Sequence, residues 1–160
     1  MIDWNTFFAA QLGASAALAG LIFVGISINM KKILEFPLLV NMALQSLVLL
    51  GTILVVSSFS LVPDQSVVFL GVEILIVGTS VWAALTSLII RNLRVVEKQY
   101  KLGQIGRSLL NQIAALSYVA AGIVTVTMGF DGINLLVPAM VISFVIALMD
   151  AWVLLVEINR

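Results

Sequence analysis

Hydrophobic residues dominate the chain in five long runs that contain no charge or almost none. The runs comprise 23 to 25 residues each and cover residues 6–29, 38–62, 66–90, 108–130 and 134–158. About 20 apolar residues in a helix are enough to cross the hydrocarbon core of a bilayer. Because each run reaches that length, the pattern predicts an all-α, polytopic membrane protein with five transmembrane helices, arranged as a single transmembrane domain over residues 1–160.

The charged residues between these runs separate by sign. The longest hydrophilic segment, residues 91–107, holds five of the eight Lys and Arg residues. If five helices cross, this segment shares one side with the remaining basic residues, and three aspartates share the other side: Lys31, Lys32 and Arg160 against Asp3, Asp64 and Asp131. Cytoplasmic loops are rich in Lys and Arg. We therefore expect an N-out, C-in orientation, with the C-terminus in the cytoplasm.

Four basic residues of the central segment recur on one side of a predicted helix. Arg91, Arg94, Lys98 and Lys101 are three or four residues apart, and a helix turns about 100° per residue. The pattern predicts a basic cytoplasmic helix that leaves the membrane near residue 90 and ends near Gly103. Contact with lipid headgroups is the first interpretation of this basic face, and docking of a cytoplasmic protein partner is the alternative.

The first hydrophobic run carries small residues at regular spacing. Ala9, Gly13, Ala16, Ala17 and Gly20 give three pairs that are four residues apart (9/13, 13/17 and 16/20). This spacing lets two helices approach closely in a membrane, where the hydrophobic effect does not drive their association. The simplest interpretation is packing of this helix against its own bundle. A contact between copies of the chain in a homo-oligomer, or the lining of a pore, is the alternative.

Two acidic residues lie in the interior of predicted spans, away from the span ends. Glu73 falls in the outer half of its span and Asp150 in the inner half of the last one. A charge deep in a bilayer is costly unless it is hydrated, paired or neutralised, and no Lys, Arg or His lies in any of the five runs. We therefore expect each acid to be protonated, bonded to polar groups such as Tyr118 or Thr125, exposed to water, or placed at a subunit interface.

Composition narrows the available chemistry. The chain is 62% hydrophobic and 10% charged, has a formal net charge of zero, and contains neither Cys nor His. A neutral membrane protein is not expected to have nucleic acid as a partner. Without Cys, His or a glycine-rich phosphate loop, we expect no catalytic residues, no metal site and no cofactor. The sequence thus predicts a protein that is not an enzyme and whose immediate surroundings are membrane lipids.

Residues 7–34 resemble the opening of a largely uncharacterised family of small bacterial multi-helix inner-membrane proteins. The resemblance lies in an Ala/Gly-rich first helix followed by Phe23-Val24-Gly25-Ile26-Ser27-Ile28-Asn29, and further on in Pro63 and the run Gly71-Val72-Glu73-Ile74-Leu75. Some members of that family are labelled modulators of a membrane-bound AAA protease. The resemblance implies a multi-pass protein of the cell inner membrane, with another membrane protein as a partner.

Two classes of function follow from these features. The first is a homo-oligomeric pore or ion-translocating protein, broadly an ion channel, in which Glu73 or Asp150 faces water. The second is a non-conducting membrane scaffold or modulator of a membrane protease, which would act through helix packing and the basic segment. Of the two, we expect the first.

Overall fold

The computed structural model describes residues 4–95 and 101–155, whose regular structure is helical, with no strand. The five long helices are α1 (Trp4–Ile28), α3 (Pro37–Ser60), α4 (Val67–Val95), α5 (Lys101–Met128) and α6 (Leu136–Leu155), and the two short ones are α2 (Met30–Glu35) and the 3-10 helix η2 (Gly129–Leu135). Four helical stretches are long and apolar enough to span a membrane, namely Trp4–Ile28, Pro37–Ser60, Val67–Arg91 and Ile105–Leu154. The predicted all-α class is confirmed, and apolar helices of this length fit a membrane protein.

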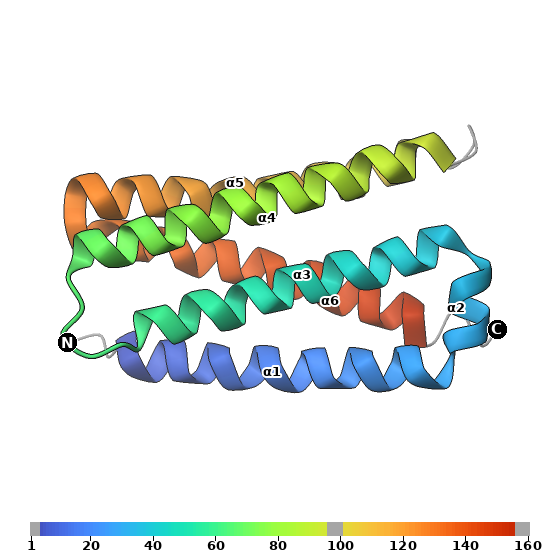
Figure 1. The fold of residues 1–160 in the computed structure, drawn as a ribbon, viewed down its shortest axis with the longest axis horizontal. Coiled ribbons are helices and arrows are strands. Elements are labelled where there is room, and N and C mark those ends of the chain that lie inside the picture. The colour runs from blue at the N-terminus through green and yellow to red at the C-terminus, as the bar shows by residue number, and fades with distance from the viewer. Residues whose placement is uncertain (1–3, 96–100, 156–160) are drawn as a thin grey trace.

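The long helices lie side by side along the longest axis of the molecule (Figure 1). α3 packs against α1, α4 and α6, and α4 packs along α5. The chain reverses direction in η2, so that α5 and α6 are antiparallel. One end of the bundle, here called the η2 end, carries the start of α1, the loop between α3 and α4, and η2. The opposite end, the α2 end, carries α2 and the final turns of α4 and α6.

Proline and aspartate shape the connections around α3. Pro37 is at the first position of α3, where the absence of a backbone N–H costs no helical hydrogen bond. After α3 ends at Ser60, Asp64 has a φ of 57°, a left-handed conformation that Asp tolerates better than most residues. The resulting turn makes α3 and α4 an antiparallel pair.

Glycines bring the backbones of α4 and α5 into direct contact. A Cβ atom added to Gly122 would lie 2.8 Å from Leu75 N, and one added to Gly71 would lie 2.8 Å from Val126 N. A Cβ on Gly78 would meet Val119 N at 3.0 Å. Real Cβ atoms almost never approach backbone atoms as closely as at Gly71 and Gly122, and rarely as closely as at Gly78, so this spacing favours glycine. We call Gly71, Gly78 and Gly122 the glycine seam.

The central basic segment differs from its prediction. α5 already begins at Lys101 and continues through Gly103, which therefore lies inside a helix and is not a C-cap. Glycine inside a helix costs about 1 kcal/mol relative to alanine, which the long apolar continuation of α5 offsets. Arg91 is exposed on α4. Lys98, in residues 96–100, and the side chains of Arg94 and Lys101 lie outside what the structure describes.

Candidate functional site

Asp150 of α6 is buried in the bundle, with 1% of its surface exposed. Its carboxylate forms an ion pair with Arg107 of α5 and accepts a hydrogen bond of 2.7 Å from Ser46 Oγ of α3. The prediction that Asp150 has no basic partner is therefore wrong. The reason is that α5 begins at Lys101 rather than near residue 108, so that Arg107 is part of the helix and its long side chain reaches the core. Asp150 needs no protonation to be accommodated there.

An amide pair lies beside the ion pair. Asn111 follows Arg107 by one helical turn, Gln45 precedes Ser46, and Asn111 Nδ2 donates a hydrogen bond of 3.0 Å to Gln45 Oε1. Both amides are buried. Gln45 Nε2 and Asn111 Oδ1 have no hydrogen-bond partner in the described protein. Buried polar groups are almost always hydrogen-bonded, and this donor and acceptor together match the hydrogen-bonding capacity of a water molecule.

Further buried polar residues continue from this level toward the η2 end. Tyr118 OH and Ser143 Oγ are 3.2 Å apart, and both residues are fully buried. Thr125, seven residues beyond Tyr118 on α5, is also buried and donates to its own helix at Ala121 O. Tyr118 thus contacts Ser143, and Thr125 bonds to Ala121. Neither bonds to Asp150, which was one of the predicted alternatives. Together these side chains form the polar column: Gln45, Ser46, Arg107, Asn111, Tyr118, Thr125, Ser143 and Asp150.

Glu73 lies outside this column. It is half-buried on α4 near the η2 end and accepts a hydrogen bond of 2.5 Å from Gln65 Nε2 in the preceding loop. Asp150 belongs to the last turns of α6, near the α2 end. The two acids predicted as candidates are therefore at opposite ends of the bundle and do not form one site.

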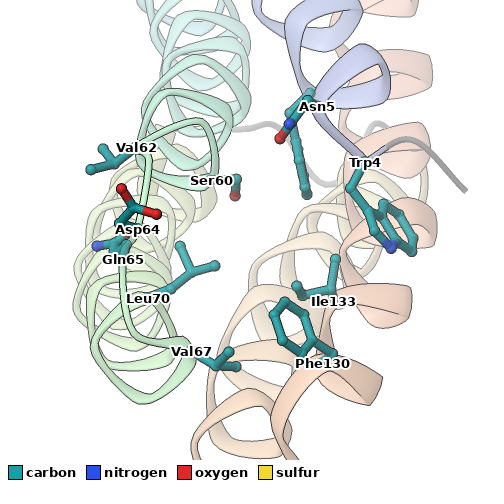
Figure 2. A pocket seen from close by; sticks show the side chains of 11 residues that line it. Trp4, Asn5, Ser60, Val62, Asp64, Gln65, Val67, Leu70, Phe130 and Ile133 are labelled. Atoms are coloured by element: carbon teal, nitrogen blue, oxygen red, sulfur yellow. The ribbon is translucent and has the colours of Figure 1, made fainter.

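A cleft of about 160 Å³ opens at the η2 end. Figure 2 shows its walls, in which Trp4 of α1 and Phe130 of η2 stand across from the loop that carries Asp64 and Gln65. Ser60, at the end of α3, lies between them. The remaining lining residues are Asn5, Phe8, Val62, Val67, Leu70 and Ile133. This cleft is an opening at the end of the bundle toward which the polar column runs.

The segment η2, which forms one wall of the cleft, also packs on the polar column. A Cβ atom added to Gly132 would lie 2.3 Å from both Thr125 N and Thr125 Oγ1. Ile133, the next residue, lines the cleft. Thr125, the last polar side chain of the column, thus packs against η2 beside a residue that lines the cleft.

The small residues predicted for helix packing all lie on the outer surface of α1. Ala9, Gly13, Ala16, Ala17 and Gly20 are exposed, and nothing lies within 4 Å of a Cβ built on either glycine. α1 instead buries its opposite face against the bundle, through Phe8, Ser15, Ile22 and Gly25. The prediction that the small residues pack against their own bundle is therefore wrong. Large side chains such as Phe8 gain more dispersion contacts in the core than alanine or glycine.

The polar column contains one acidic side chain, one basic side chain, two amides and several hydroxyls. Among the described residues, no three His, Cys, Asp or Glu side chains gather as metal ligands would. The arrangement is suited to hydrogen bonding, and its residues are supplied by α3, α5 and α6. No protein-family model matches the chain, and no curated protein or solved structure does either. Arguments about function therefore rest on the polar column and on the outer face of α1.

Proposed function

We propose that this chain translocates ions across a bacterial inner membrane and that the Arg107–Asp150 pair is its central site. A buried ion pair is a poor stabilising device, because desolvation of the two charges offsets their attraction and apolar replacements are often as stable. Charges inside membrane proteins are characteristic of ion and proton pathways. The observation that carries the proposal is the convergence of this pair with Ser46 and with amide atoms that have no protein partner.

The proposal includes five membrane crossings. The candidate span Ile105–Leu154 has 50 residues, which as one helix would extend about 75 Å, more than twice the thickness of the hydrocarbon core. A reversal at η2 divides it into two crossings of suitable length. Large apolar side chains are exposed on both helices, among them Leu109, Ile113 and Leu148, and they suit contact with lipid tails.

Charge at the two ends supports an N-out, C-in orientation. Lys31, Lys32 and Arg91 belong to the α2 end, whereas Asp64 and Asp131 belong to the η2 end. The positive-inside rule then assigns the α2 end to the cytoplasm. Alkaline-phosphatase fusions at Asp64 and Asp131 should be active and a fusion at Gly103 inactive, and the reverse result would overturn this orientation.

Ion translocation is testable with the purified full chain in liposomes. Under an imposed membrane potential, we expect wild-type vesicles to pass protons or cations and Asp150→Asn vesicles to lose that flux, because the amide in this variant can neither accept a proton nor balance the charge of Arg107. The matched control is Asp131→Asn, since Asp131 is an exposed acid at the η2 end. Its flux should equal that of the wild type.

The single substitution leaves Arg107 without its partner, which destabilises a buried site. The double variant Arg107→Gln/Asp150→Asn removes both charges while keeping polar side chains of similar size, and it should fold but not conduct. Wild-type vesicles as tight as empty ones, or full flux in the folded double variant, would refute ion translocation through this pair.

The outer face of α1 favours a second candidate, a non-conducting membrane scaffold or modulator of a membrane protease. Lipid-facing positions are usually large and apolar, whereas small residues at four-residue spacing are typical of helix contacts. In this proposal the face formed by Ala9, Gly13, Ala16, Ala17 and Gly20 binds a second copy of the chain, giving a homo-oligomer. Such an assembly is also compatible with ion translocation by each protomer.

Mass measurement in nanodiscs tests the contact between copies. Gly13→Leu and Gly20→Leu should dissociate the oligomer without unfolding the protomer, because both positions are open. Ala120→Leu is the control, since Ala120 is exposed on α5, away from this face. A monomeric wild type, or an oligomer that survives both glycine substitutions, argues against the contact. Tight liposomes from an oligomeric wild type would favour the scaffold over the translocator.

A further inference from the structure

Several buried polar residues of α3, α5 and α6 lie seven positions apart. On α5 they are Asn111, Tyr118 and Thr125, on α6 Ser143 and Asp150, and on α3 Gln45 and Thr52, all of them buried. Seven residues complete about two helical turns and rise about 10 Å. The repeat therefore places polar side chains in levels, one above another, along one inward face of each helix.

At the level nearest the α2 end, some polar atoms have no hydrogen-bond partner in the protein. The hydrogen bond between Asn111 and Gln45 leaves Gln45 Nε2 and Asn111 Oδ1 without a protein partner, and Arg107 Nε is likewise unmatched. A donor and an acceptor that both need a partner suit water, which supplies either role. Arg107, with 23% of its side chain exposed, links this level to the α2 end.

The middle level consists of a directed pair of hydroxyls. Ser143 Oγ donates a hydrogen bond of 2.8 Å to Ala139 O, one turn closer to the η2 end. With that proton engaged, Tyr118 OH is the donor in its 3.2 Å contact with Ser143 Oγ. The two hydroxyls therefore form a donor chain from Tyr118 through Ser143 to Ala139 O, which lies closer to the η2 end on α6.

The charges of the column distinguish a proton from a metal cation. A metal ion needs several oxygen ligands at once, and the column has a single carboxylate, already paired with the guanidinium of Arg107. A proton needs neither a ligand cage nor space, and it moves between hydroxyls and water through hydrogen bonds.

We infer that the translocated ion is a proton, which crosses the core along the polar column with the Tyr118–Ser143 hydroxyl pair as its middle relay. In each step Tyr118 accepts a proton from water on the Asp150 side as it gives its own to Ser143, and Ser143 turns its own proton away from Ala139 O and releases it to water on the η2 side. No net charge remains on either hydroxyl, and rotation of both restores the starting arrangement. This inference rests on the proposed function.

Proton flux into liposomes containing a pH-sensitive dye tests the relay. Tyr118→Phe keeps the ring and the packing but removes the hydroxyl, so flux should fall by at least about tenfold. Ser143→Ala should have the same effect. The matched control is Ser80→Ala, because Ser80 is exposed on α4 and bonds only the carbonyl of Ile76 in its own helix. Its flux should stay within about twofold of the wild type.

Thiol labelling tests whether water reaches the column, independently of flux. The chain has no native cysteine, so Ser143→Cys and Ser80→Cys each present a single thiol. A small water-soluble thiol reagent should label Ser143→Cys, because it reacts with the thiolate that forms only in contact with water, and should spare Ser80→Cys in lipid. Labelling of Ser80→Cys alone, or of neither thiol, would overturn the hydrated column.

The outcomes separate the two proposals. Flux in the wild type that is lost in both Asp150→Asn and Tyr118→Phe supports the relay. Flux that is lost in Asp150→Asn but intact in Tyr118→Phe overturns the relay alone. Flux carried only by a metal cation overturns the proton, and tight wild-type vesicles overturn the proposed function and the relay together.

Discussion

The glycine seam and the outer face of α1 use the same kinds of residue with opposite results. At Gly122 a Cβ would lie 2.8 Å from Leu75 N of the neighbouring helix, whereas at Gly13 and Gly20 nothing lies within 4 Å. Small residues at helical spacing therefore indicate where a close approach is sterically allowed, but not which helix makes it. The other residues on each helix decide which helix makes the contact. α1 turns Phe8 and Ile22 inward, whereas α4 and α5 have glycine at the contact itself.

The largest effect is expected at Gly132, where η2 meets α5. A Cβ there would lie 2.3 Å from Thr125 N and 2.6 Å from Thr125 Cα, and backbone cannot yield as a side chain does. Gly132→Ala should lower the free energy of unfolding by about 3 kcal/mol or more, measured by thermal unfolding in nanodiscs. Gly106→Ala is the control, because Gly106 lies on the same helix as Thr125 and has nothing within 4 Å. Equal stability of the two variants would disprove the close contact.

An intermediate effect is expected in the glycine seam. Gly122→Ala would force a Cβ against Leu75 N at 2.8 Å and Leu75 Cα at 2.9 Å, and we expect a loss of about 1–3 kcal/mol. Gly78→Ala should cost less, because its nearest atom, Val119 N, lies at 3.0 Å. Unfolding in graded detergent mixtures ranks the two variants. If Gly78→Ala lost more stability than Gly122→Ala, α4 and α5 would separate more easily than their spacing indicates.

The helices were predictable because their signals are local. Each of the five hydrophobic runs coincides with one long helix, because length and hydrophobicity require no knowledge of neighbours. The ends shift, most of all at the start of α5, which is Lys101 where the run starts at residue 108. The turn at Pro63 and Asp64 was also predictable from residue type. The short helix α2 was not predicted, because its residues fall between two hydrophobic runs.

The polar column was only partly predictable. The sequence identifies Asp150 as an acid inside the membrane. It places Arg107 in a hydrophilic connection, because an assignment based on charge alone puts every basic residue near a span into a loop. Whether its side chain enters the core depends on where α5 begins and on how α3 and α6 pack, and neither is a local property. The intervals of seven from Asn111 to Thr125 and from Ser143 to Asp150 were the available signal.

The smallest effect, and the one that decides most about α1, is expected at Gly13 and Gly20. In an isolated protomer both positions are open helical sites, so Gly13→Ala and Gly20→Ala should each stabilise the fold by up to about 1 kcal/mol through helix propensity. If α1 binds a second copy through this face, the added methyl groups instead separate the two backbones, and the oligomer should lose stability. The sign of the change therefore distinguishes the two states.

Thermal unfolding at high lipid-to-protein ratio should show a gain in stability, and the same measurement at low ratio should show a loss. A gain at both ratios would leave the small residues of α1 facing lipid, and a loss at both would contradict the open surface from which the contact between copies is inferred.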